Sequence, residues 1–134
     1  MDVQTMAIES VLRGKKILLL EDDVLQAQSL AFELEEYGVE VIGPFHVSED
    51  GLRSAGRDAV DAAILDVHLF DGNCFSVADA LMRRRIPFIF LSGHERRAMP
   101  DRYRHVPHYL KPFAGDDVTA ALSLAVTDRY RHRP

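Results

Sequence analysis

The stretch "KKILLLEDDV", Lys15 to Val24, joins a short apolar run to three consecutive acidic residues. Its apolar part, Ile17 to Leu20, does not alternate with polar residues, which is typical of a strand buried on both faces of a parallel sheet. The carboxylates of Glu21, Asp22 and Asp23 follow where such a strand reaches the edge of its sheet. The stretch therefore predicts a buried strand that ends in an acidic cluster.

Short apolar runs of the same kind recur along the chain. They cover Ala62 to Leu65, Phe88 to Leu91 and Tyr109 to Leu110, and the segment Val39 to Gly43 is a further strand candidate. Helical patterns of apolar residues lie between the runs, at about 27–37, from 48 onward, 75–84, 97–103 and 116–127. Strands alternating with helices predict an α/β fold, a doubly wound five-stranded parallel sheet with helices on both faces.

Three residues predict where helices begin and end. Gly38 follows the first helical pattern and predicts its C-terminal end, because glycine readily adopts the backbone conformation found there. Asp23 stands directly before that helix, and Ser48 stands at the start of the next. Both side chains can accept hydrogen bonds from the first free N–H groups of a helix, so we expect each to act as an N-cap.

Composition narrows the class of protein. The 134 residues, 47% of them hydrophobic, suffice for one folded domain, expected over 15–128 with an extension at 1–14 and a tail at 129–134. A net charge of −5 argues against nucleic-acid binding, and no apolar run approaches the roughly 20 residues that span a bilayer. The single cysteine, Cys74, suits a reducing compartment and is expected to be a packed or idle thiol, with a redox role as the alternative. These observations predict a cytoplasmic protein.

Polar residues follow the predicted strands at their carboxyl ends. They are Glu21 and Asp22 after the first, Asp66 after the third, Ser92 after the fourth and Lys111 after the fifth. In a doubly wound sheet these ends meet at one edge, where ligands bind. Each residue alone has a simpler explanation as a helix cap, a turn residue or a surface charge. Five converging positions favour a functional site.

The residue types indicate the chemistry of that site. Two carboxylates about 5 Å apart repel each other by roughly 3 kcal/mol at an effective dielectric of about 20, so such a cluster raises a pKa or holds a cation. Oxygen ligands in a compact site favour Mg²⁺. A metal beside a carboxylate nucleophile, with a lysine and a hydroxyl opposite, suits phosphoryl transfer.

Four segments together resemble a known family. "ILLLEDD", "AILDVHLFDG", "PFIFLSG" and "YLKPF" follow in the order and spacing of response-regulator receiver domains of two-component signalling, and the resemblance covers Lys15 to Asp128. It implies a flavodoxin-like fold with strand order 2-1-3-4-5, and Asp66 as the residue that accepts a phosphoryl group. It also implies a cis Lys111–Pro112 bond.

The resemblance further implies a ligand set and partners. Mg²⁺ would be held by Asp22 and Asp66, by Glu21 through water and by the backbone carbonyl of His68. Ser92 and Lys111 would contact the phosphoryl group. The donor would be a histidine kinase or a histidine phosphotransfer protein. The receiver would then signal by docking to a downstream protein or by passing its phosphoryl group onward, and it could form a homodimer. No external substrate is expected to turn over, and no output domain is expected after the last helix.

The chain departs from the family pattern at several positions. Phe70 stands where receivers usually have proline, and His108, with Tyr109 beside it, stands where the switch aromatic is expected. "PFIFLSGHE" is similar to the "PFxFATGxY" signature of an alphaproteobacterial subgroup that often consists of single-domain proteins working with kinases of the HWE type. His68 and His94 flank the predicted phosphoryl position, and we hypothesise that they tune how long the group persists.

Two other interpretations stay open at this point. A hydrolase of the haloacid dehalogenase type also uses a strand-end aspartate, Mg²⁺ and a lysine, but it requires a second aspartate where this chain has His68. A receiver that has lost phosphorylation could act purely as an interaction module, which Phe70 and His108 would support. The complete set of carboxylates, hydroxyl and lysine argues against that second alternative, because an unused carboxylate cluster only costs stability.

Overall fold

The computed structural model of the 134-residue chain describes residues 2–93, 99–112 and 115–131. A five-stranded parallel sheet forms its centre, in the order β2-β1-β3-β6-β7, which confirms the predicted order 2-1-3-4-5. Its strands are β1 (Lys16–Leu20), β2 (Glu40–Phe45), β3 (Ala62–Asp66), β6 (Phe88–Ser92) and β7 (His108–Leu110). The apolar runs thus become strands, as predicted. Strands β1, β3 and β6 are buried, whereas the outer strands β2 and β7 are partly exposed.

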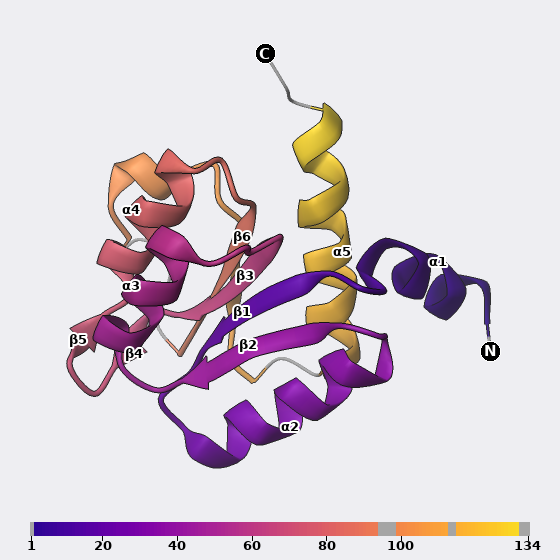
Figure 1. Cartoon of the computed structure of the whole chain (residues 1–134), viewed down its shortest axis with the longest axis horizontal. Coiled ribbons are helices and arrows are strands. Elements are labelled where there is room, and N and C mark those ends of the chain that lie inside the picture. The colour runs from indigo at the N-terminus through magenta and orange to yellow at the C-terminus, as the bar shows by residue number, and fades with distance from the viewer. Residues whose placement is uncertain (1, 94–98, 113–114, 132–134) are drawn as a thin grey trace.

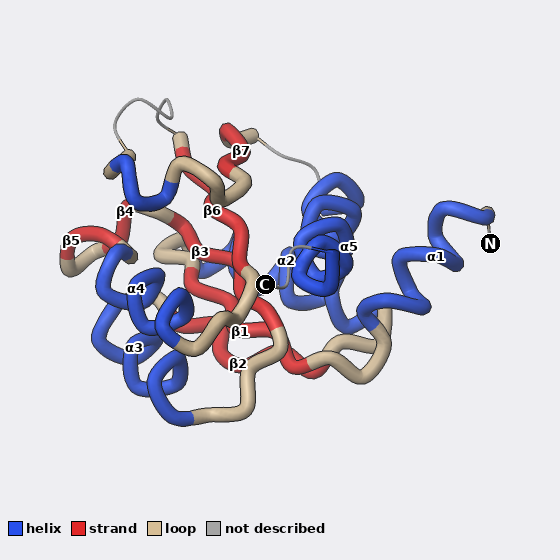
Figure 2. Tube along the Cα trace, turned by 90° about the horizontal axis from the view of Figure 1, so that it is seen from above, coloured by secondary structure: helices blue, strands red, loops and turns tan. Residues whose placement is uncertain are grey.

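Helices cover both faces of the sheet. They are α1 (Val3–Leu12), α2 (Val24–Glu36), α3 (Ser48–Arg57), α4 (Phe75–Arg83) and α5 (Gly115–Arg131), with a short 3-10 helix, η2 (Asp101–Tyr103). Helices α3 and α4 lie on one face, and α2, α5 and α1 lie on the other (Figures 1 and 2). No helix within the described ranges is long and apolar enough to cross a membrane.

Alternate residues of the central strands build two hydrophobic cores. Leu18 and Leu20 of β1 join Phe90 of β6 in the core beneath α3 and α4. Ile17 and Leu19 point the other way, into the core beneath α2 and α5. Cys74 is fully buried in the first core, so the prediction of a packed thiol is confirmed. A strand with both faces buried explains why these runs show no polar alternation.

The residues before the first strand form a ten-residue helix. Asp2 caps α1 by accepting a hydrogen bond from the Thr5 N–H at 2.7 Å. Ile8 and Leu12 are buried in the core beneath α2 and α5, whereas Val3 and Met6 are exposed. Figure 1 shows α1 beside α5, next to the start of β1. Helix α1 therefore adds side chains to one of the two central cores.

A small hairpin follows β3 that the apolar pattern did not predict. Strand β4 (His68–Leu69) pairs with β5 (Gly72–Asn73) in antiparallel fashion. Phe70, at the position where receivers usually have proline, lies at the tip and is 77% exposed. The loop after Asp66 thus folds back on itself before α4 begins.

One predicted helix cap is wrong. Ser48 is the first residue of α3 itself, and Val47 occupies the N-cap position. The Ser48 hydroxyl instead donates to Asp71 Oδ2 at 2.7 Å. The other two helix predictions are confirmed: Asp23 caps α2, accepting from the Gln26 N–H at 3.0 Å, and Gly38 follows the end of that helix with a φ of +82°.

Candidate functional site

The carboxyl ends of the strands bring the predicted residues to one edge of the sheet. Glu21 directly follows β1, Asp66 ends β3, Ser92 ends β6, and Lys111 directly follows β7. Backbone pairing fixes the last two together, because the Ser92 carbonyl accepts the Lys111 N–H at 2.8 Å. The Lys111–Pro112 bond is cis, as the resemblance implied.

Three carboxylates form a compact group at this edge. Glu21, Asp22 and Asp66 each offer one oxygen, and these oxygens lie within 4.8 Å of one another. Glu21 and Asp66 are almost fully buried, at 3% and 5% exposure, whereas Asp22 is half-buried. An all-oxygen donor set of this size fits the ligand preference of Mg²⁺.

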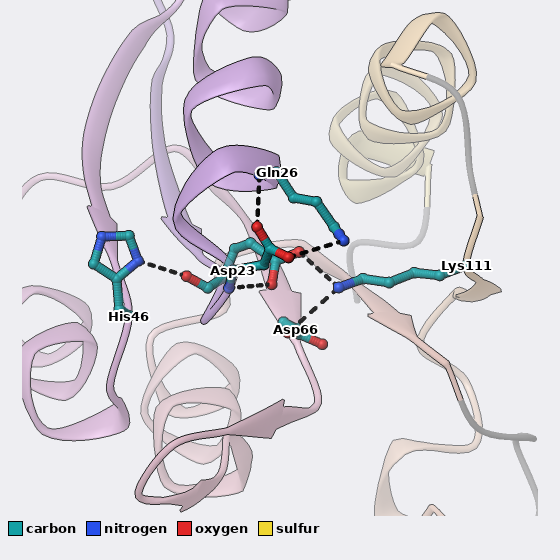
Figure 3. Close-up of polar contacts among 6 residues, drawn as sticks. Asp23, Gln26, His46, Asp66 and Lys111 are labelled. Carbon is teal, nitrogen blue, oxygen red and sulfur yellow. Dashed lines mark hydrogen bonds and ion pairs between the residues drawn. The ribbon is translucent and has the colours of Figure 1, made fainter.

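A lysine side chain links two of the carboxylates (Figure 3). Lys111 Nζ lies 2.6 Å from Glu21 Oε1 and 3.4 Å from Asp66 Oδ2. The first contact is a short charge-assisted hydrogen bond, and the second is a longer ion pair. The ammonium group therefore offsets part of the negative charge that burial concentrates here.

Burial and mutual repulsion give Glu21 and Asp66 different pKa values. Burial, together with the hydrogen bond and the charge of Glu21, raises the pKa of Asp66 to about 8. The positive charge of Lys111 acts in the opposite direction and lowers the pKa. Burial also opposes ionisation of Glu21, but hydrogen bonds from Asp66, Lys111 and the Asp23 N–H outweigh it and lower the pKa of Glu21. The metal-free pair therefore shares one proton near neutral pH, held mainly by Asp66.

The remaining acidic residue of the opening stretch has a separate role. Asp23 uses its carboxylate to cap α2, and its own N–H donates to Glu21 Oε2 at 3.1 Å. The helix that starts at Val24 thus helps to hold the Glu21 side chain. Figure 3 shows Asp23 and Gln26 on the side of the cluster toward α2.

Other predicted positions lie around this cluster. Ser92 is 1% exposed, and His68 begins β4 two residues beyond Asp66. His108 packs edge-on against Phe90, with ring centroids 6.4 Å apart, whereas Tyr109 packs against the opposite core. His94 lies outside the described residues, so the hypothesis that it acts with His68 stays a prediction.

Sequence reasoning missed two contacts that support the cluster. His46 Nδ1 donates to the Glu21 carbonyl at 2.8 Å (Figure 3). The Phe45 carbonyl accepts the Glu21 N–H at 2.9 Å. Asp71 binds the first turn of α3. Neither His46 nor Asp71 stands at the end of a strand that its apolar run predicts. The signal available was the position of His46 shortly after the second apolar run.

Comparison with known proteins agrees with the fold. No family model matches the chain. The transcriptional regulatory protein PdtaR of Mycobacterium tuberculosis is 28% identical over 121 residues, which cover 87% of this chain and 58% of PdtaR. The solution structure of SdrG from Sphingomonas melonis Fr1 is 36% identical with a TM-score of 0.72, covering 87% of this chain and 98% of SdrG. A CheY-like receiver domain protein from Methanospirillum hungatei, 19% identical with a TM-score of 0.78 over 89% of this chain and 98% of its own, shares the fold.

The chain belongs to the response-regulator receiver domains of two-component signalling. This assignment excludes the alternative that the chain is a hydrolase of the haloacid dehalogenase type. The chain spans about half the length of the curated relatives that it matches, 58% of PdtaR and 45% of the sensory transduction protein LytT of Bacillus anthracis. Its relatives carry the names of regulators.

Proposed function

We propose that this receiver accepts a phosphoryl group on Asp66 from a phosphohistidine of a histidine kinase or phosphotransfer protein. The observation that carries the proposal is the position of Lys111 Nζ between the buried carboxylates of Glu21 and Asp66. A salt bridge that served stability alone needs one carboxylate, and the second buried carboxylate makes the arrangement costly. Retention of both favours a use for their charge.

Mg²⁺ fits the donor set and would be held by Asp22 and Asp66, by Glu21 through water and by the backbone carbonyl of His68. When bound, the ion supplies positive charge that neutralises the phosphoryl oxygens and positions them for transfer. The nearby residues set the charge and the protonation at Asp66. Lys111 balances negative charge, and loss of the shared proton frees Asp66 Oδ for attack.

The transfer balances as a displacement at phosphorus. An Asp66 carboxylate oxygen forms the new P–O bond while the P–N bond to the donor imidazole breaks. The electron pair of the P–N bond returns to the imidazole nitrogen, which takes a proton from solvent. Lys111 pairs with a phosphoryl oxygen, and the Ser92 hydroxyl at the end of β6 donates to another. The chain's residues thus provide the acceptor and orient the group, which is most of what phosphoryl transfer requires.

The phosphorylated form would act on a partner protein or pass its phosphoryl group onward. A new group with strong acceptor oxygens biases the loops beside Ser92 and Lys111 toward one arrangement. By analogy with the family, the surface formed by η2, β7 and α5 would receive the partner, which is a downstream protein or a second copy of this chain. This chain then needs no external substrate.

The test is intact-protein mass after incubation with acetyl phosphate, with and without Mg²⁺. We expect a Mg²⁺-dependent gain of one phosphoryl group in the native chain and none in Asp66→Asn. Half-exposed Asp58 offers the matched control, because Asp58→Asn removes a carboxylate of the same type, which lies beside Arg57 away from the site. The contrary outcome is that the native chain gains no phosphoryl group from acetyl phosphate or from a phosphorylated phosphotransfer protein, and binds no Mg²⁺. In that case an interaction module that works without phosphorylation is the better explanation.

A further inference from the structure

A carboxylate in the hairpin after β3 binds the start of a distant helix. Asp71, at the turn between β4 and β5, accepts hydrogen bonds from the Ser48 N–H at 2.9 Å and the Ser48 hydroxyl at 2.7 Å. The Glu49 N–H approaches the same carboxylate at 3.4 Å. These bonds hold the pKa of Asp71 below its usual value, so the residue is ionised at neutral pH.

Helix α3 receives its N-terminal cap from this hairpin. The N-cap position is occupied by Val47, whose apolar side chain cannot accept a hydrogen bond. The first N–H groups of a helix need such acceptors, and a negative charge there also interacts favourably with the helix dipole. Asp71 supplies both from 23 residues further along the chain. The hairpin and the start of α3 are therefore joined.

The hairpin itself offers little else to hold its tip. Its strands have two residues each, and an isolated hairpin of that size is not stable in water. Leu69 is buried and anchors the first strand, but Phe70 at the tip is 77% exposed. Asp71 comes directly after Phe70, so its bonds to Ser48 fix the tip that packing leaves unsupported.

The same hairpin begins at the proposed phosphorylation site. Asp66 ends β3 and His68 begins β4, so the proposed metal-ligating carbonyl of His68 lies on a strand that Asp71 anchors at its far end. We propose that Asp71 is a positioning residue, which holds the β4–β5 hairpin against α3 and thereby keeps the His68 carbonyl in place for Mg²⁺. This inference rests on the proposed function and extends it by one residue.

A purely structural role for Asp71 can be separated from positioning with a second variant. Arg84 binds the opposite end of the same helix, where its guanidinium donates to the Ala55 carbonyl at 2.7 Å and to the Asp58 carbonyl at 2.8 Å. Arg84→Ala therefore weakens the attachment of α3 without touching the hairpin. Asp71→Ala removes the cap and frees the hairpin together.

The experiment compares Mg²⁺ binding by titration calorimetry of the metal-free proteins, well below the melting temperature of every variant. Loss of an outer residue that orients a metal ligand commonly costs about tenfold in affinity, and we expect that loss in Asp71→Ala. Asp71→Asn should stay within about twofold of the native chain, because its amide oxygen still accepts from the Ser48 N–H. Arg84→Ala should leave Mg²⁺ affinity unchanged although its melting temperature falls.

A second readout follows the hairpin without metal. The Cys74 N–H donates to the Val67 carbonyl at 3.0 Å and closes the base of the hairpin. Exchange of this amide with solvent should accelerate in Asp71→Ala and stay as in the native chain in Arg84→Ala. Should Asp71→Ala fail to fold, Ser48→Ala removes one of the same bonds and takes its place.

The outcomes distinguish the two proposals. If the native chain binds no Mg²⁺, the proposed function fails and this inference fails with it. If the native chain binds Mg²⁺ and Asp71→Ala binds it equally well, the positioning role alone is overturned. The same conclusion follows if Arg84→Ala weakens Mg²⁺ binding as much as Asp71→Ala does when both lose the same melting temperature. Selective loss in Asp71→Ala with recovery in Asp71→Asn supports it.

Discussion

Asp66 carries a proton that the unfolded chain would lose. Its carboxyl has an ordinary pKa of 3.8, whereas burial beside Glu21 raises the pKa to about 8 in the folded protein. Folding therefore binds a proton between these two values. The stability that depends on this proton is fully present below about pH 4 and is lost as the pH rises toward 8.

This proton predicts a pH dependence that Asp66→Asn abolishes. In metal-free native protein, with EDTA present, we expect the free energy of unfolding to fall between pH 5 and pH 8 by at most about 1.4 kcal/mol per pH unit. Asp66→Asn should show a flatter profile and be the more stable protein at pH 8, by at least about 1 kcal/mol. Urea unfolding across this range measures both.

Two further samples complete that measurement. Asp58→Asn, which alters a half-exposed carboxylate, should keep the native slope. Addition of Mg²⁺ should restore stability to the native chain at pH 8 and leave Asp66→Asn less affected, since the ion binds the folded state. A native slope retained in Asp66→Asn would show that another group carries the pH dependence.

Replacing Lys111 tests two roles of its ammonium group, balancing the charge of the carboxylates and contacting the phosphoryl group. Its ammonium group lies against both Glu21 and Asp66 and competes with a cation for their charge. Lys111→Ala should therefore bind Mg²⁺ at least as tightly as the native chain. Phosphorylation by acetyl phosphate should slow by about tenfold or more, because a preorganised donor to the phosphoryl group is lost. Calorimetry and intact mass give the two values, and a loss of Mg²⁺ affinity would contradict this account.

At the scale of elements, β2 places two groups against the site through an irregular backbone. Gly43 has a φ of +103°, and a Cβ added there would lie 2.7 Å from the Phe45 backbone nitrogen. Only glycine fits such a position without strain. The bend allows the Phe45 carbonyl to accept the Glu21 N–H and brings His46 to the Glu21 carbonyl.

Gly43→Ala should therefore destabilise the protein by about 1–3 kcal/mol. Backbone atoms, which cannot swing aside as a side chain would, cause the clash. Gly56→Ala is the matched control, because Gly56 lies inside α3 with open space around its Cβ position and alanine favours helix there. Denaturant unfolding should show a loss in the first variant and no loss in the second. Equal effects would mean that β2 relaxes around the new methyl group.

The sequence predicts elements whose residues carry their own pattern. The buried runs of β1, β3 and β6 have no alternation and were identified as strands, and Asp23 and Gly38 marked the ends of α2 correctly. The two-residue strands β4 and β5 are too short to show any hydrophobic period, so the hairpin was missed. Ser48 was misread because the acceptor of its hydroxyl, Asp71, lies in a distant segment.

The same limit applies to the site. Glu21, Asp66, Ser92 and Lys111 stand at strand ends, so the topology rule was enough to predict that they meet. The 2.6 Å contact of Lys111 with Glu21, shorter than its 3.4 Å contact with Asp66, depends on side-chain packing and could not be predicted from spacing. Local pattern thus identified which residues gather, and tertiary contacts decide how charge is divided among them.

At the scale of the whole molecule, the sheet separates the candidate site from α1. The site lies at the carboxyl ends of the strands, whereas α1 leads into the amino end of β1. Leu12 of α1 is fully buried among the residues beneath α2 and α5. Helix α1 therefore belongs to the packed body, and its contribution should appear in stability and leave the chemistry at the other end unchanged.

Leu12→Ala tests this division. Removing a fully buried leucine side chain leaves a cavity and should cost about 2–5 kcal/mol in the free energy of unfolding. Met6→Ala changes a residue of the same helix that is 56% exposed, and it should cost less than about 0.5 kcal/mol. Mg²⁺ affinity measured well below the melting temperature should match the native chain in both variants. A weakened Mg²⁺ affinity in Leu12→Ala would mean that the core beneath α2 transmits changes from α1 to Glu21, and a cost below about 1 kcal/mol would mean that α1 detaches from the body in solution.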